Sequence, residues 1–375
     1  MTWQARRAGL LKSAGGRVLL WLLSVAYGGA VMARGLCYDL GLLRSRKAGA
    51  KVVCIGNITT GGTGKTPATV LAAQTLRRSN HAVAILSRGY GRPQRSPAIC
   101  VINDDSTLDW RQCGDEPWMM HQILNGQGVP ILVASDRVRA AAQAVTFFNS
   151  RVLILDDGFQ HRRLQRDLDV VLVNAADPFG GRRLLPMGNL REPLRALRRA
   201  GLIMLTHVDQ VPDAVLAALR EEIIRINPRA PLIEAVHRPD FLLEASTGRR
   251  FPLAHLAGRP VGTLSGLGAP EQFESCLERN GLAVAQRWRY PDHHRYDSAE
   301  LGSISHLLGA LPLITTYKDL VRFPPDWRQS LSGQVFVLSI KLDIIKGAEV
   351  WNETLERLGG AAGASPGSPA GVAAA

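Results

Sequence analysis

The sequence predicts an α/β protein in which a mostly parallel sheet carries helices on both faces, followed by a smaller C-terminal α/β unit. From Lys51 to about Pro239, short apolar runs alternate with helical segments, a pattern typical of a parallel sheet. A second alternating region continues to about Gly359. Before both regions, the uncharged stretch Val18–Ala33 predicts an N-terminal helix.

These patterns divide the chain into four parts. We expect an N-terminal membrane-associated helical segment over residues 1–43 and the larger α/β core over residues 44–240. The smaller α/β domain is expected over residues 241–359. Residues 360–375 are almost entirely Ala, Gly, Pro and Ser, a composition that predicts a disordered tail.

The composition excludes several classes of protein. A chain of 375 residues that is 46% hydrophobic and 21% charged is globular and large enough for two domains. Its five cysteines are scattered, without a CxxC spacing, which argues against a disulfide framework or a zinc site. The net charge of +13 suits a polyanionic substrate or an anionic membrane surface. Nucleic acid is not expected, because aromatic residues are only 6% and no DNA-binding motif is found.

The most informative segment is a glycine-rich loop between a predicted strand and a predicted helix. The apolar run Lys51–Ile55 leads into the loop, and the helical pattern Pro67–Leu76 follows it. In a phosphate-binding loop, Lys65 would reach the β- and γ-phosphates and the Thr66 hydroxyl would bind Mg²⁺. The predicted ATP-binding residues are Thr59, Thr60, Gly61, Gly62, Thr63, Gly64, Lys65 and Thr66. The larger domain is therefore expected to be P-loop NTPase-like, although Thr59 stands where glycine is usual.

Acidic residues follow another predicted strand. The run Val152–Leu155 ends in Asp156 and Asp157, a position where a P-loop protein supports Mg²⁺ with an aspartate. The basic loop that comes next contains Gln160 and His161. This loop either contacts phosphate groups or forms a solvated charged turn.

Three further positions have both a catalytic and a structural interpretation. Asp115 is either a helix N-cap or the carboxylate that accepts the proton of an attacking hydroxyl. His293 is either a surface residue or a histidine that orients a catalytic aspartate across a domain cleft. Arg191 either clamps a phosphate or belongs to a turn that starts a helix.

The N-terminal apolar run is short for a full membrane span and has basic residues on both sides. We expect a helix inserted into, or lying on, the cytoplasmic face of the inner membrane, where anionic lipids attract Arg and Lys. A secretory signal and a buried core helix are the alternatives.

The motifs together resemble those of the tetraacyldisaccharide 4′-kinases, the lipid A 4′-kinases of Gram-negative bacteria. The matching segments occur in family order over most of the chain: Gly56–Pro67, Ser87–Gly91, Gly114–Pro117, Leu155–His161, Leu190–Pro193 and Pro291–His293. In one departure, Tyr317 stands where the family motif Thr-Glu-Lys-Asp has Glu.

The resemblance implies transfer of the ATP γ-phosphoryl group to the 4′-hydroxyl of a tetraacylated glucosamine disaccharide 1-phosphate. It implies that Asp115 is the general base, paired with His293, and that Lys65 and Thr66 contact phosphate and Mg²⁺. It further places Glu116, Asp156 and Asp157 around the metal and Arg191 near the phosphates. The expected partners are the anionic glycolipid and the membrane surface, with no obligate protein partner.

Two other classes stay open from the residues alone. One is a P-loop switch or metallochaperone-type NTPase that acts on a protein partner, and the other is a soluble kinase of small metabolites. The absence of a Cys/His metal pair and the presence of the apolar N-terminal run argue against the first, and the apolar run argues against the second.

Overall fold

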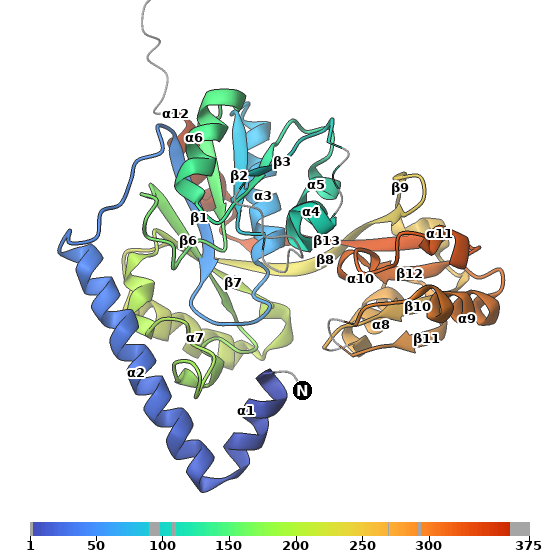
Figure 1. Ribbon diagram of the computed structural model, residues 1–375, viewed down its shortest axis with the longest axis horizontal. Coiled ribbons are helices and arrows are strands. Elements are labelled where there is room, and N and C mark those ends of the chain that lie inside the picture. Colours follow the sequence, from blue (N-terminus) through green and yellow to red (C-terminus); the bar gives the residue numbers. More distant parts are fainter. Residues whose placement is uncertain are drawn as a thin grey trace, which may run out of the picture.

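The computed structural model describes residues 3–89, 98–106, 108, 110–268, 270–291 and 294–360. Within these residues the strands form one sheet that runs through the whole molecule (Figure 1). The strands are β1 (Lys51–Asn57), β2 (Val83–Ser87), β3 (Cys100–Ile102), β4 (Ile131–Val133), β5 (Val152–Asp156), β6 (Leu168–Asn174), β7 (Leu202–Thr206), β8 (Leu232–Glu244), β9 (Arg250–Phe251), β10 (Pro260–Ser265), β11 (Ala283–Arg289), β12 (Leu313–Thr316) and β13 (Val335–Lys346).

The α-helices are α1 (Trp3–Lys12), α2 (Ala14–Asp39), α3 (Lys65–Arg78), α4 (Trp110–Cys113), α5 (Asp115–Leu124), α6 (Arg137–Phe148), α7 (Asp213–Ile226), α8 (Pro270–Arg279), α9 (Ser298–Leu308), α10 (Tyr317–Leu320), α11 (Trp327–Ser330) and α12 (Ala348–Gly360). Short 3₁₀ helices are η1 (Gly180–Arg182), η2 (Leu194–Arg199), η3 (Val208–Gln210) and η4 (Leu253–Leu256).

The sheet consists of two parallel blocks. The order of strands along it is β11-β10-β12-β13-β8-β7-β6-β1-β5-β2-β4-β3. Neighbours from β8 to β4 are parallel, as are neighbours from β11 to β13. The blocks meet where β8 pairs antiparallel with β13, and β3 adds an antiparallel edge to β4. The predicted α/β class with a mostly parallel sheet is therefore confirmed.

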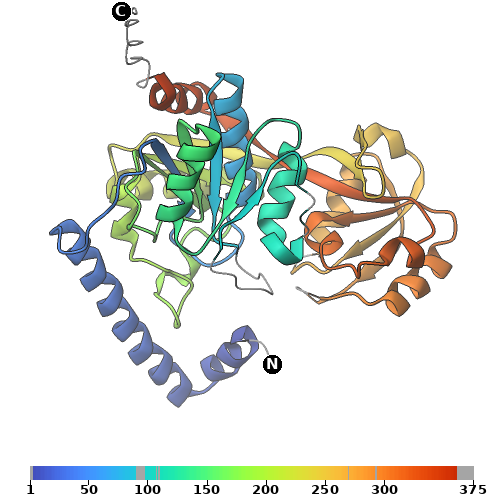
Figure 2. The ribbon, with the colours of Figure 1, turned by 45° about the horizontal axis from the view of Figure 1, so that its top comes forward.

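The antiparallel junction turns the two blocks toward each other. Strand β8 runs out of the larger block, and β13 runs back from the smaller block toward it. Because each block is parallel to its own long strand, the carboxyl ends of both blocks point toward the region between them (Figure 2). Ligands of parallel sheets bind at such carboxyl ends.

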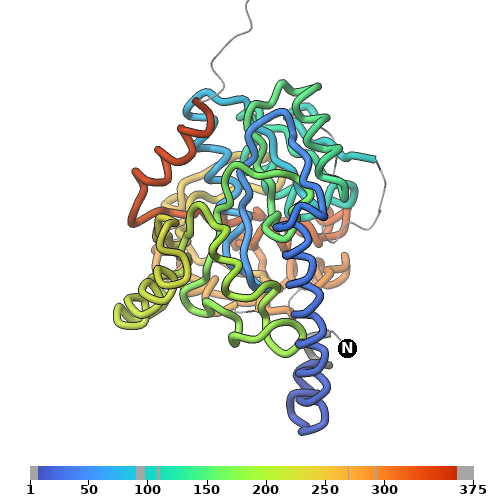
Figure 3. Tube along the Cα trace, turned by 90° about the vertical axis from the view of Figure 1, so that its left-hand side faces the viewer, coloured from blue at the N-terminus to red at the C-terminus, as the bar shows by residue number. Residues whose placement is uncertain are grey.

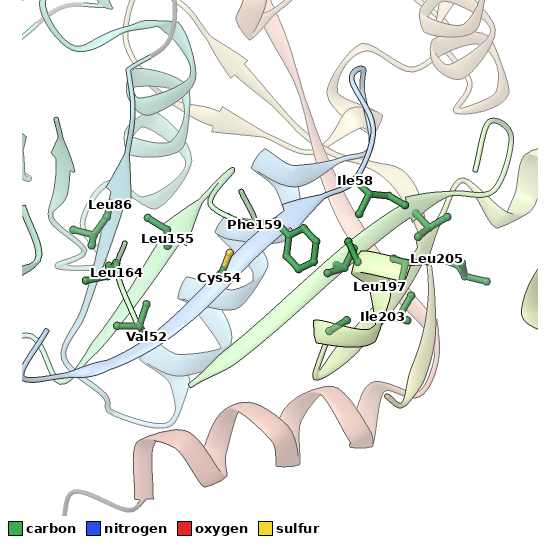
Figure 4. Close-up of a cluster of buried hydrophobic side chains, with 14 of the residues drawn as sticks. Val52, Cys54, Ile58, Leu86, Leu155, Phe159, Leu164, Leu197, Ile203 and Leu205 are labelled. Carbon is green, nitrogen blue, oxygen red and sulfur yellow. The ribbon is translucent and has the colours of Figure 1, made fainter. Parts of the chain in front are cut away.

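Helices cover both faces of the larger block. Helices α6 and α7 pack on one face, together with η2. Helices α3, α5 and α12 pack on the other. Figure 4 shows the first of these clusters, in which Phe159 lies against β1. A Cβ atom at Gly56 would lie 2.6 Å from the Phe159 Cβ, so only glycine allows this contact.

The structure adds strands that the sequence analysis did not predict. These are the edge strand β3, the short β9 and the long β8, which passes through the proposed boundary at residue 240 without interruption. The carboxyl-terminal half of β13 and the helix α12 pack on the larger block, where Leu342, Trp351 and Leu355 belong to its core. The four-part division of the chain stays a prediction, and the tail 361–375 lies outside the described residues.

The N-terminal segment forms two helices instead of one. Ser13 separates them and caps α2, because its Oγ accepts a hydrogen bond from the Gly16 amide at 3.0 Å. Helix α2 extends along one side of the larger block (Figure 3). It is long and apolar enough to cross a membrane by length and composition. Only Gly16, Leu20 and Gly28 of α2 are buried, so the alternative of a buried core helix is wrong.

Helix α12 packs on α3, the helix that follows the phosphate loop. The Trp351 side chain is fully buried and its Nε1 donates to Thr75 Oγ1 at 3.0 Å. Replacement of Trp351 by Ala should lower the free energy of unfolding by about 3–5 kcal/mol, because a large cavity remains. Trp351→Phe, which keeps much of the ring but loses the donor, should cost about 1–2 kcal/mol. Denaturant unfolding measures both, and equal losses would contradict this account.

Candidate active site

The loop from Thr59 to Thr66 connects β1 with α3, as the sequence predicts. Gly61 and Gly64 have φ angles of 117° and 82°, in the left-handed region that favours glycine. A Cβ atom at Gly64 would also lie 2.7 Å from His237 Nε2. Both glycines are therefore required by the backbone of the loop.

Hydrogen bonds from three directions hold this loop. Asn57 Nδ2 donates to Thr63 Oγ1 at 3.0 Å, and Thr206 Oγ1 donates to the Thr63 carbonyl at 3.1 Å. The Thr60 amide donates to the Asn189 carbonyl at 2.7 Å. Thr59 is buried and forms an antiparallel bridge with Leu190. The loop thus accommodates threonine where glycine is usual.

Two aspartates follow β5 beside the loop. Asp156 is buried, and its two carboxylate oxygens accept hydrogen bonds from Thr69 Oγ1 and Ser87 Oγ, each at 3.1 Å. Burial and the negative charge of Asp157 raise the pKa of Asp156. Asp157 Oδ1 lies 3.7 Å from Lys65 Nζ. Three of the predicted residues, one basic and two acidic, therefore meet at the strand ends.

Arg191 completes this group. Its Nη1 donates to the two carboxylate oxygens of Asp157 at 2.9 and 3.0 Å. Gln160 lies beside it, with Oε1 3.4 Å from Arg191 Nη1, and donates through Nε2 to the Asn57 carbonyl at 2.9 Å. Arg191 lies three residues before Leu194, the first residue of η2, and forms an ion pair with Asp157, so its role at a phosphate stays a prediction.

Asp115 and Glu116 begin α5. Gly114 occupies the cap position, and Asp115 Oδ1 accepts a hydrogen bond from the Glu116 amide at 3.1 Å. The interpretation of Asp115 as a helix N-cap is therefore wrong, because the residue lies one position further along the helix.

The charges around Glu116 connect α5 with the phosphate loop. Desolvation, and then the negative charges of Asp156 and Asp115, raise the pKa of Glu116 to about 7. The positive charges of Lys318 and Lys65 oppose this shift. The Glu116 side chain is exposed to solvent, which weakens the effect of desolvation relative to that of the neighbouring charges. They indicate more negative than positive charge around this carboxyl group.

The smaller block contains further motif residues that the structure describes. His293 lies outside the described residues, together with Asp292 and with Tyr90 and Gly91. His294 lies in the smaller block, where its Nε2 is 3.1 Å from Glu300 Oε2 and its ring stacks on Tyr290. Tyr317 is buried in the core of that block. The acid that the family motif has at this position is therefore absent from this chain.

His161 lies among arginines. Burial, followed by the charges of Arg137 and Arg166, lowers the pKa of His161 to about 4. Its buried Nε2 has no hydrogen-bond partner in the described part of the chain. His161 is therefore neutral near pH 7 and surrounded by positive charge.

Arg137 is a candidate site residue that sequence reasoning missed. It is only 6% exposed, and its Nε has no partner among the residues that the structure describes. Burial, and then the charge of Arg88, lowers the pKa of Arg137, whereas Asp157 and Asp156 oppose this shift. The signal in the sequence is an arginine in the first turn of a helix, where the helix dipole disfavours a cation.

The parallel sheet, the glycine-rich loop and the acids at the strand ends define an α/β protein of the P-loop class. The family described as tetraacyldisaccharide-1-P 4′-kinase matches residues 16–359. The chain is 42% identical over 345 residues to a tetraacyldisaccharide 4′-kinase from Elusimicrobium minutum, covering 92% of each chain. It is 39% identical over 356 residues to the one from Anaeromyxobacter dehalogenans (strain 2CP-C), covering 94% of this chain and 93% of that relative.

A solved structure supports the same assignment. The "apo" form of LpxK from Aquifex aeolicus, in complex with ATP, is 30% identical, with a TM-score of 0.74 over 92% of this chain and 99% of that one. The chain belongs to the tetraacyldisaccharide 4′-kinase family and is a kinase. The two alternative classes from the sequence analysis are therefore not supported.

The acid cluster predicts a dependence of stability on pH. A carboxyl group whose pKa is about 7 in the folded state and 4.5 when unperturbed favours folding at low pH. This contribution to the free energy of unfolding is lost as the pH rises from 4.5 to about 7, because the folded state must then release a proton. Glu116→Gln should therefore raise the melting temperature of the ligand-free protein more at pH 8 than at pH 5.

The matched control is Glu349→Gln, at an exposed position on α12. Thermal unfolding at both pH values measures the difference. An equal shift for Glu116→Gln at pH 5 and pH 8 would contradict the assigned charge cluster.

Proposed function

We propose that this protein transfers the γ-phosphoryl group of ATP to the 4′-hydroxyl of a tetraacylated glucosamine disaccharide 1-phosphate during lipid A biosynthesis. The family description and the ATP complex of the related structure support the two substrates. The observation that carries the proposal is the cluster at the phosphate loop, where Lys65 Nζ lies 3.7 Å from Asp157 Oδ1 and Arg191 pairs with the same carboxylate. The raised pKa of Glu116 adds the start of α5 to this cluster.

ATP is proposed to bind along Thr59–Thr66. The amides of the loop and the N-terminus of α3 face the phosphates, and the Lys65 ammonium group neutralises charge on the β- and γ-oxygens. Lys65 and Arg191 both contact Asp157. On binding, the phosphate oxygens would take over these cations, and the aspartate would become available for other partners.

The residues present fit a Mg²⁺ ion. In the described part of the chain, no three acidic, His or Cys side chains form a complete metal site. Mg²⁺ commonly binds through one or two carboxylates, water and substrate phosphates, so a complete protein cage is not required. The negative charges that raise the pKa of Glu116 provide a suitable field. We propose that Thr66, Glu116, Asp156 and Asp157 surround the ion, which would draw charge from the transferring phosphoryl group.

Asp115 is proposed to accept the proton of the attacking hydroxyl. It lies at the start of α5, directly before Glu116, whose carboxyl group is influenced by the charges of Asp156 and Lys65. Helix α5 also packs against the smaller block through Trp118, Met119 and Ile123. A residue from the smaller block can therefore approach Asp115, and we propose that His293 orients its carboxylate.

Arg137 is proposed to bind the phosphate that the acceptor already carries. The buried Arg137 donates through Nη1 to the Ser135 carbonyl at 2.8 Å, and its Nε has no partner among the described residues. A phosphate oxygen would satisfy this remaining donor with a charge-assisted hydrogen bond. The acceptor of the family is itself a phosphorylated disaccharide by its description.

The acyl chains of the acceptor are proposed to remain in the bilayer. Helix α2 exposes a row of large apolar side chains, which is consistent with attachment to the cytoplasmic face of the inner membrane. The exposed residues of this helix are Val18, Leu19, Trp21, Leu22, Leu23, Val25, Met32 and Leu36.

Replacement of Asp115 by Ala should lower turnover by at least about 10²-fold, because the acceptor hydroxyl loses its base. Binding of ATP should be retained. Transfer of labelled γ-phosphate to the disaccharide acceptor measures turnover, and calorimetry measures nucleotide binding. A variant with wild-type turnover would rule out this role.

Replacement of Arg137 by Ala should raise the KM for the 1-phosphorylated acceptor about tenfold, because a charge-assisted interaction is lost. The KM for an acceptor that lacks the 1-phosphate should change little. Arg139→Ala, an exposed position on the same helix, is the control. A similar increase for both acceptors would show that Arg137 does not recognise this phosphate.

A further inference from the structure

One segment of the larger block contacts both the N-terminal helices and the phosphate loop. Residues 184–191, here called the bridging segment, lie between α2 and the turn that follows β1. We propose that attachment of α2 to a membrane is coupled to nucleotide binding through this segment, with Tyr27 and Arg7 as positioning residues. The proposal rests on the proposed function, because it takes the exposed face of α2 as the membrane-binding surface.

The N-terminal helices hold the bridging segment at its two ends and near its middle. Ser24 Oγ donates to the Leu184 carbonyl at 2.9 Å, and Tyr27 OH donates to the Arg191 carbonyl at 2.9 Å. Arg7 Nη1 donates to Asn189 Oδ1 at 2.6 Å. Gly28 lies so close to Leu184 that an added Cβ would be 2.8 Å from its Cδ1. The helices are therefore packed on the segment and bonded to its backbone.

The opposite side of the same segment holds the phosphate loop. The Asn189 carbonyl accepts the Thr60 amide at 2.7 Å, and the Arg191 amide donates to the Ile58 carbonyl at 2.7 Å. Leu190 forms the bridge with Thr59. Asn189 thus bonds to Arg7 through its side chain and to the loop through its carbonyl, so a shift of α1 or α2 displaces both.

Tyr27 acts on the site through Arg191. Its hydroxyl group bonds to the backbone carbonyl and leaves the guanidinium group free to pair with Asp157. A second link runs from Arg34 on α2 to the Gln160 carbonyl at 2.8 Å. Gln160 and Arg191 are in contact with each other. Gln160 and Arg191, which are both proposed to lie near the phosphates, therefore each accept a hydrogen bond from a side chain of α2.

The outer face of α2 makes the coupling sensitive to a membrane. Most of the helix is exposed, so a large part of its surface is available to lipid. Insertion of the apolar face restrains the helix, and the hydrogen bonds from Ser24 and Tyr27 pass that restraint to the bridging segment. An ordered phosphate loop binds nucleotide more tightly, because less conformational freedom is lost on binding.

The test measures the affinity of the full-length protein for Mg·ATP by calorimetry, with and without vesicles of phosphatidylethanolamine and phosphatidylglycerol. Vesicles should tighten binding by about fivefold in the wild type, at the lower end of common coupling factors. Tyr27→Phe should lose this increase while still binding vesicles. The control is Tyr38→Phe on the same helix, whose ring contacts Arg162 and is kept by the substitution. It should show the wild-type factor.

Linkage gives an independent check. Mg·ATP must tighten vesicle binding by the same factor by which vesicles tighten Mg·ATP binding. A wild-type affinity that is unchanged by vesicles, or a Tyr27→Phe protein that keeps the full factor, would overturn the proposal. If Tyr27→Phe does not fold, Ser24→Ala removes a separate bond to the bridging segment and should reduce the factor; retention of the full factor there would count equally against coupling.

The readout does not depend on the acceptor. Transfer of labelled phosphate to the disaccharide is measured in parallel on the same samples. Loss of the vesicle effect with transfer intact would reject only the coupling, whereas an intact vesicle effect without transfer would reject only the proposed acceptor.

Discussion

Antiparallel pairing between β8 and β13 joins two parallel sheet blocks head to head. In an ordinary parallel sheet, all carboxyl ends lie on one edge and a single set of loops forms the site. Here the pairing directs a second set of carboxyl ends, including that of β12, toward the first. The charge of Lys318, just after β12, therefore reaches Glu116 on α5 in the larger block. The approach of the smaller block to the site follows from this one junction.

The site itself is organised by charge. Lys65 and Arg191 are held by Asp157, while Asp156 is satisfied by two hydroxyl groups, and Glu116 carries a raised pKa. The buried Arg137 and the neutral His161 form a second group, in which no carboxylate contacts the Arg137 guanidinium directly among the described residues. At the first region, Lys65 and Arg191 are the groups whose charge is complementary to a polyanionic nucleotide. At the second, the Arg137 guanidinium group is complementary to a phosphorylated acceptor.

The N-terminal helices contribute more than an attachment point. Helix α2 exposes large apolar side chains, while polar contacts join the N-terminal helices to the bridging segment, to the Gln160 carbonyl and to Arg162. The same segment is hydrogen-bonded to the phosphate loop. Helix α2 thus combines an exposed apolar surface with hydrogen bonds to the bridging segment, whose other side is bonded to the phosphate loop.

Local chemistry was sufficient for the sequence to determine the phosphate loop, the strands around it and the acids that follow β5. Glycines with positive φ, β-branched runs and N-terminal helix signals act over a few residues, so they can be read without a fold. The long strand β8 was not predicted because Pro239 interrupts its apolar pattern. The helix break at Ser13 was not predicted because only the apolar run that follows it was interpreted as helical. Only the tertiary structure decided that Asp157 pairs with Arg191, that the buried Arg137 Nε has no partner among the described residues, and that Tyr27 contacts the Arg191 carbonyl. These depend on burial and on contacts between distant segments, which no local pattern encodes.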